Sequence, residues 1–127
     1  EYAKQSYSGN PKPDEHWTYS IPWDISKEAV WSFIWCAKDQ AALDSNMKDI
    51  QLKFTLDGTD LDPSTMSVAT TPNQGMLCEL DYYVLNDWPA GEHHLTIAST
   101  FTKPINNGTA DYPAGTSYYD YTVYVGK

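Results

Sequence analysis

The sequence predicts an all-β protein, a two-sheet antiparallel β-sandwich of about seven strands, with a jelly roll as the alternative. Its 127 residues include ten Tyr, five Trp and three Phe, and aromatic side chains favour pleated, half-buried surfaces. Strand-like runs alternate with turn signals containing Pro, Gly or Asn, and no segment reads as a long helix. A chain of this length is one domain with a core of its own.

The strand with the strongest signal covers residues 31–37, WSFIWCA. It contains three aromatic residues and one of the two cysteines, and it has no Gly, Pro or acidic residue. A strand of this composition has to be buried. We expect its partner to be residues 76–80, MLCEL, which carry the second cysteine.

The two cysteines, Cys36 and Cys78, predict a disulfide. Neither belongs to a CxxC motif and neither has a histidine close by in the sequence, so metal or redox chemistry is disfavoured. In the chain-entropy model such a bridge stabilises the fold by roughly 4 kcal/mol. We expect it to pin two facing layers. It also predicts an extracellular or cell-surface location, with a signal peptide already removed.

The first half of the chain divides into five expected segments. Residues 1–15 are polar and contain Pro and Gly, which is typical of an extended arm or linker, so the sandwich domain is expected to cover 16–127. Residues 16–21 alternate and are followed by Pro22, which predicts a short edge strand ending there. A turn at 23–28 leads into a strand at 29–37. Residues 38–47 contain helix formers over about two turns and predict a short helix or a structured loop.

The second half begins with the cleanest alternation in the chain, residues 50–56, where one apolar and one polar face predict an antiparallel strand. Asp57 and Gly58 form a turn signal behind it. Residues 61–71, where Pro63 and Pro72 bracket Met66, Val68 and Thr70, predict a short edge strand. Further strands are expected at 76–85, 92–101 and 117–125, with a long loop at 103–115.

Several short motifs resemble immunoglobulin-like domains of bacterial secreted or surface-anchored proteins. They are WCA at 35–37, Leu43 with Asn46, Ile50 with Phe54, the turn at 57–58, Cys78, and PAGEHHL at 89–95. The resemblance covers roughly residues 30–101 and implies a fold and a compartment, without naming a ligand. The chain departs from antibody-type domains because its Trp stands beside the first cysteine and not on the next strand.

The candidate ligand-binding residues follow from the alternation of side chains along a strand. If both cysteines face the core, Val30 and Ile34 face it too, and the odd-numbered aromatics of this strand face outward. These are Trp31, Phe33 and Trp35. They would form a flat platform for sugar rings or for an apolar protein face. The alternative is a strand buried on both faces. Tyr118 and Tyr124 share one face of the last strand and are a second candidate surface.

Metal and modification sites have weaker signals. Asp57, Asp60 and Asp62 lie within six residues and are a weak Ca²⁺ candidate, against the alternative of a solvated hairpin turn. No other cofactor is predicted. His93 and His94 are adjacent on a strand, so they face opposite sides and cannot share one metal. Residues 107–109, Asn-Gly-Thr, fit the acceptor pattern for glycosylation at Asn107.

The sequence predicts binding and not catalysis. No nucleophile, zinc-protease or phosphate-loop motif is present. Glu79 and Asp81 share a strand face, where they could form a carboxylate pair or simply face solvent. A net charge of −9 without a basic run disfavours nucleic acid. We expect a non-catalytic secreted or cell-surface adhesion domain that engages a protein or polysaccharide through aromatic side chains. The alternative is a self-assembling subunit of an extracellular fibre or surface layer, whose N-terminal arm pairs with a neighbour.

Overall fold

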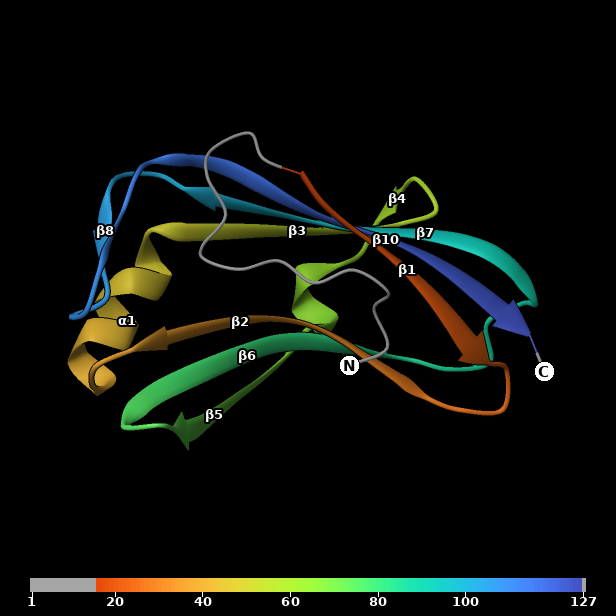
Figure 1. Ribbon diagram of the computed structural model, residues 1–127, viewed down its shortest axis with the longest axis horizontal. Coiled ribbons are helices and arrows are strands. Elements are labelled where there is room, and N and C mark those ends of the chain that lie inside the picture. Colours follow the sequence, from red (N-terminus) through yellow and green to blue (C-terminus); the bar gives the residue numbers. More distant parts are fainter. Residues whose placement is uncertain (1–15, 127) are drawn as a thin grey trace.

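The computed structural model describes residues 16–126, which form two main β-sheets (Figure 1). The larger sheet has five strands, in the order β1 (His16–Asp24), β10 (Gly115–Gly126), β7 (Gly91–Phe101), β3 (Ile50–Leu56) and β4 (Thr59–Asp60). The smaller sheet has three, in the order β2 (Ala29–Ala37), β6 (Met76–Leu85) and β5 (Ser67–Asn73). Between β7 and β10 lies a short hairpin, β8 (Ile105–Asn106) and β9 (Asp111–Tyr112). No helix in this part of the chain is long and apolar enough to cross a membrane.

The two main sheets face each other across one aromatic core. The ring of Trp31 on β2 meets that of Phe54 on β3 edge-on, with centroids 5.0 Å apart, and Tyr83 on β6 packs on the same Phe54 ring at 4.9 Å. Edge-to-face packing of this kind adds to the free energy gained by burying the rings. Leu95 and Ile97 of β7 and the two inward valines of β10 complete the centre of the core.

The prediction of a wholly antiparallel sandwich is wrong at one pair of strands. β1 runs parallel to β10, while the other strand pairs of the described chain are antiparallel. The expected end of the first strand at Pro22 is also wrong, because Pro22 lies opposite Tyr124 and pairing continues to Asp24. β1 is the edge of the described sheet, where proline is tolerated.

The predicted disulfide is present, but it does not join the two layers. Cys36 and Cys78 lie directly opposite each other on β2 and β6, within the smaller sheet. The prediction that Val30 and Ile34 face the core, and that the odd-numbered aromatic residues face outward, is therefore wrong. Val30 and Ile34 are 62% and 54% exposed, while Trp31 and Phe33 are each 5% exposed. The bridge lies on the outer face. The alternative, a strand buried on both faces, is also wrong, because only the face that carries the aromatic residues is buried.

The short elements agree closely with the expectations. The predicted short helix is α1 (Gln40–Lys48). Asp39 is its N-cap, and the Asp39 carboxylate accepts a hydrogen bond from the Ala42 N–H at 2.9 Å. Asp57 and Gly58 have φ values of 50° and 84°, as expected for a tight hairpin turn.

The weakly predicted segment 61–71 contains two elements. It begins with a 3₁₀ turn, η1 (Pro63–Thr65), and continues as the edge strand β5, which runs on through Pro72 to Asn73. The predicted strand 76–85 is confirmed as β6.

Candidate functional site

The unequal size of the two sheets leaves one side of the core incompletely covered. β2 is the edge of the smaller sheet, and the larger sheet extends beyond it by the width of β1. The inward-facing residues of β1 therefore stay only half-buried; they are Tyr19, Ile21 and Trp23. A cavity of about 630 Å³ lies between these residues and the first half of β2.

A second cavity, of about 300 Å³, continues along the other half of β2. Phe33, Trp35 and Cys36 line it, together with Tyr112 of the short β8–β9 hairpin and Tyr119 of the larger sheet. We call the two cavities and the adjoining edge of β2 the β2 groove. It follows the length of one strand and has mainly apolar walls.

The direction of the backbone groups of β2 follows from contacts at its end. The Cys36 carbonyl accepts a hydrogen bond from Asn107 Nδ2 at 3.1 Å, and the Lys38 N–H donates to the Asn107 carbonyl at 2.9 Å. Both groups therefore point away from β6. Residues of an antiparallel pair alternate in this respect. We infer that Val30, Ser32 and Ile34 direct their N–H and C=O groups into the groove.

No hydrogen-bond partner for these outward backbone groups is found within residues 16–126. An unpaired strand edge is a template for another strand. Trp31 Nε1 and Trp88 Nε1, which belong to residues lining the larger cavity, are also buried without an acceptor in the described chain. An unpaired buried donor costs about 1–3 kcal/mol. The groove thus offers backbone donors and acceptors along β2 to an occupant.

The sequence-predicted binding residues fall into two separate places. Trp31, Phe33 and Trp35 do not form an exposed platform; all three contribute to the floor of the groove. Tyr118 and Tyr124 lie on the outer face of the larger sheet. Tyr118 stacks on His16 with centroids 4.3 Å apart, and Tyr124 is 49% exposed.

The three carboxylates proposed for Ca²⁺ are engaged separately. Asp57 accepts hydrogen bonds from His93 and His94, Asp60 lies 3.3 Å from Lys53 Nζ, and Asp62 caps η1. In the described part of the chain, no cluster of three possible metal ligands exists. The structure does not bring these residues together as a metal site.

Asn107 has a structural role in the folded chain. It is 4% exposed, its Oδ1 accepts hydrogen bonds from Thr109 and Ala110, and its Nδ2 donates to the Cys36 carbonyl. A sugar would have to be attached to this same Nδ2. The folded chain therefore does not support glycosylation at Asn107.

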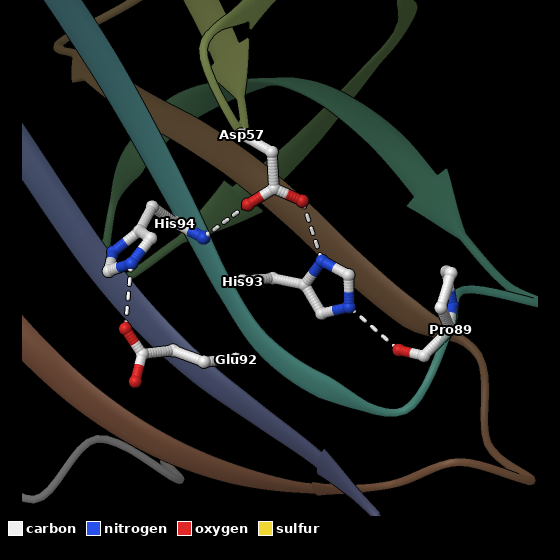
Figure 2. Close-up of polar contacts among 5 residues, drawn as sticks. All are labelled: Asp57, Pro89, Glu92, His93 and His94. Carbon is white, nitrogen blue, oxygen red and sulfur yellow. Dashed lines mark hydrogen bonds and ion pairs between the residues drawn. The ribbon is translucent and has the colours of Figure 1, made fainter.

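His93 joins the turn after β6 to the turn after β3 (Figure 2). Its Nδ1 lies 2.6 Å from Asp57 Oδ2, and its Nε2 lies 2.7 Å from the Pro89 carbonyl oxygen. The ring also stacks on Trp88, which lines the groove. The side chain of His94 points away from this site, toward Glu92, so the two histidines face opposite sides as predicted.

Both ring nitrogens of His93 face acceptors, which favours the doubly protonated ring. The hydrogen bond to Asp57 and then that to the Pro89 carbonyl raise the pKa of His93, against the effect of burial. Burial raises the pKa of Asp57, but the hydrogen bonds from His93 and the His94 N–H, with the histidine charges, lower it overall. The pair is therefore an ion pair at mildly acidic pH.

We expect this pair to make stability depend on pH. The contribution of His93 is fully present below its ordinary pKa of 6.5 and is lost as pH rises through the raised value. The contribution of Asp57 is present above its ordinary pKa of 3.8 and is lost as pH falls through its lowered pKa. The melting temperature should therefore fall between pH 6 and pH 8.5, and by less in His93→Gln. An equal fall in the variant would contradict this role.

No protein-family model matches this chain, and neither the curated proteins nor the solved structures give a match. Fold and site together define a predominantly β domain with two main sheets and one disulfide. The disulfide indicates an oxidising compartment.

Proposed function

We propose that this protein is a non-catalytic binding domain, secreted or displayed on a cell surface, that captures an extended segment of a partner protein in the β2 groove. The observation that carries the proposal is the edge of β2, which has no neighbouring strand on that side within residues 16–126 and has apolar cavities along its length. In strand addition, main-chain hydrogen bonds supply affinity and pockets for alternate side chains supply specificity. The aromatic walls of the groove would be those pockets.

We further propose that the fold is an immunoglobulin-like sandwich whose first strand has changed sheets. Such sandwiches place strands A, B, E and D in one sheet and C, F and G in the other. In chain order, β2, β6 and β5 correspond to B, E and D, and β10, β7 and β3 to G, F and C. β1 takes the place of A in the chain but pairs with β10, so no strand of residues 16–126 occupies the position of A beside β2. The disulfide joins B to E, a departure from the B–F bridge of antibody domains.

The free backbone edge favours a polypeptide over a polysaccharide. A glycan could stack on aromatic rings of the groove, but it cannot continue a β-ladder. Only another strand would pair with the N–H and C=O groups that Val30, Ser32 and Ile34 direct outward.

We expect a proline at position 32 to abolish binding without unfolding the protein. Ser32→Pro removes one outward N–H, and proline is tolerated where the N–H does not belong to the ladder. The alternation places Thr70 in the same position on β5, the other edge of this sheet, so Thr70→Pro is the matched control. Peptides selected from a displayed library of extended 12-residue sequences should bind the wild type and Thr70→Pro alike. Their affinity for Ser32→Pro should be at least about tenfold lower.

Other results would contradict strand capture. If no selected peptide distinguishes Ser32→Pro from Thr70→Pro, the groove is not the binding site. If a soluble polysaccharide quenches tryptophan fluorescence equally in the wild type and in Ser32→Pro, the ligand is a glycan held by side chains alone. Peptide binding that appears only when the chain is shortened to residues 16–127 would instead support strand capture, with the protein's own first residues competing for the groove.

Self-assembly is a second candidate, favoured by the apolar outer face of the smaller sheet. Val30 and Val84 are direct neighbours across β2 and β6, and they are 62% and 50% exposed. Exposed apolar patches of this kind mark association surfaces. Sedimentation at two concentrations separates the two candidates: a monomer at both supports capture of a partner, and concentration-dependent growth supports self-assembly.

A further inference from the structure

A third cavity, of about 450 Å³, lies on the side of the sandwich away from the β2 groove, between β3, β5 and β6. Most of its wall is apolar and comes from Leu52, Phe54, Met66 and Val68. Glu79 and Asp81 of β6 also line it. Side chains two residues apart on a strand share one face, so both carboxyl groups project between the sheets. The cavity thus combines an apolar wall with one acidic position.

Asp81 is unusual within this wall. It is 4% exposed, and its Oδ1 is buried with no hydrogen-bond partner in the part of the chain that the structure describes. A buried carboxylate oxygen without a donor is costly, and native proteins normally satisfy such groups. The unpaired oxygen therefore points to a missing donor in the cavity.

The neighbouring charges leave this position acidic. Burial, then the hydrogen bond to Asp81 and the charges of Asp81 and Asp44, raise the pKa of Glu79 to about 7. Glu79 therefore changes its protonation state near neutral pH. Lys53 also lines the cavity, but its Nζ lies 3.3 Å from Asp60 Oδ2, with both side chains more than half exposed. Lys53 is paired at the rim and does not neutralise the interior.

The chemistry of the walls selects the kind of cation. Ca²⁺ takes six to eight oxygen ligands and Mg²⁺ demands near-octahedral geometry, whereas the described residues contain no cluster of three possible ligands here. A primary ammonium group has three N–H donors, which suit the oxygens of two carboxylates. An alkyl chain attached to it would cover the apolar wall. An organic ammonium therefore fits this cavity better than a metal ion.

We propose that this cavity binds a primary alkylammonium group, from a lysine side chain or a free alkylamine, through Glu79 and Asp81. When the ammonium binds, a proton carried by Glu79 leaves to solvent, and the N–H groups of the ammonium donate to both carboxylates. The site is separate from the β2 groove and does not depend on the function proposed for it. Protonation of Glu79 at lower pH competes with the ligand.

Calorimetric titration with n-hexylammonium chloride tests the site. We expect saturable binding at pH 8 that is at least about tenfold weaker at pH 5, because Glu79 is then protonated. It should also be at least about tenfold weaker in Glu79→Gln at pH 8. Nα-acetyl-lysine amide, titrated in parallel, tells whether a lysine side chain of another protein or only a free amine is accepted. Glu92→Gln, on the exposed start of β7, is the matched control and should bind as the wild type does.

Several outcomes would overturn this proposal. They are equal binding of 1-hexanol, undiminished binding in Glu79→Gln, or no saturable heat with the intact protein. Saturable Ca²⁺ binding that Glu79→Gln abolishes would make it a metal site instead. If Glu79→Gln fails to fold, Asp81→Asn takes its place in the titration. In the wild type, the NMR signal of the Glu79 carboxyl carbon should also shift when hexylammonium is added, and no shift would overturn the proposal.

Discussion

Replacing Trp31 with alanine is expected to lower the free energy of unfolding by about 3–5 kcal/mol, the usual cost of truncating a large core aromatic. The ring is 5% exposed and packs against Phe54 and Tyr83 from both sheets. Its removal leaves a void between the layers that the surrounding strands can close only in part. Urea denaturation followed by circular dichroism measures the effect without relying on tryptophan fluorescence.

Ile34→Ala is the matched control for this prediction. Ile34 lies three residues further along β2, but its side chain is 54% exposed on the outer face. A surface substitution of this kind should change the free energy of unfolding by no more than about 0.5 kcal/mol. If Ile34→Ala cost as much as Trp31→Ala, the strand would face the core with its even-numbered residues and the assignment of faces would be wrong.

Loss of the disulfide is expected to have an effect of similar size. Cys36 and Cys78 are separated by 42 residues, and opening a loop of this length costs roughly 4 kcal/mol in the chain-entropy model. The bridge fastens β2 to β6, its one neighbouring strand in the described part of the smaller sheet. Reduction should therefore loosen the wall of the β2 groove as well as destabilise the domain.

The measurement compares urea midpoints of the oxidised protein, the reduced protein and the double variant Cys36→Ala, Cys78→Ala. Reduced and double-variant proteins should unfold at similar, much lower urea concentrations than the oxidised one. Identical midpoints for all three would mean that the bridge contributes nothing to stability. Finding both thiols free in native material would remove the argument for an oxidising compartment.

Local patterns in the sequence predicted the elements but not the direction they face. The alternation at 50–56, the run at 76–85 and the turn at 57–58 are confirmed as β3, β6 and a hairpin turn. In β2, however, both sets of alternate residues are apolar, so periodicity cannot decide which set is buried. The prediction that the even-numbered residues of β2 are buried rests on the cysteines facing the core. The structure instead buries the larger aromatic side chains and leaves Val30 and Ile34 outside.

The β2 groove could not be predicted because it depends on the order of strands in space. The first and last strands of the domain pair with each other, and no local pattern signals a contact over about a hundred residues. Trp88 was missed for a related reason, since it stands in a predicted turn. Trp88 stands directly before Pro89, and a large aromatic residue in a turn indicates that the turn packs back onto the core. Trp88 is indeed buried.

The carboxylate pair was predicted in part. Glu79 and Asp81 do share a face, as the alternation of β6 requires. One expectation was that both side chains face solvent. They instead lie on the same face of β6 as Leu77 and Tyr83, and that face is the inner one. Buried acidic residues are rare, so composition alone argues against this placement.

Amide hydrogen exchange along β2 tests the central claim most directly, because it reports which backbone groups have partners. The open edge predicts alternation: the amides of Val30, Ser32 and Ile34 exchange rapidly, while those of Trp31, Phe33 and Trp35, paired with β6, are protected. Uniform protection of all six amides in the isolated monomer would contradict the account, since the position beside β2 would then already be filled.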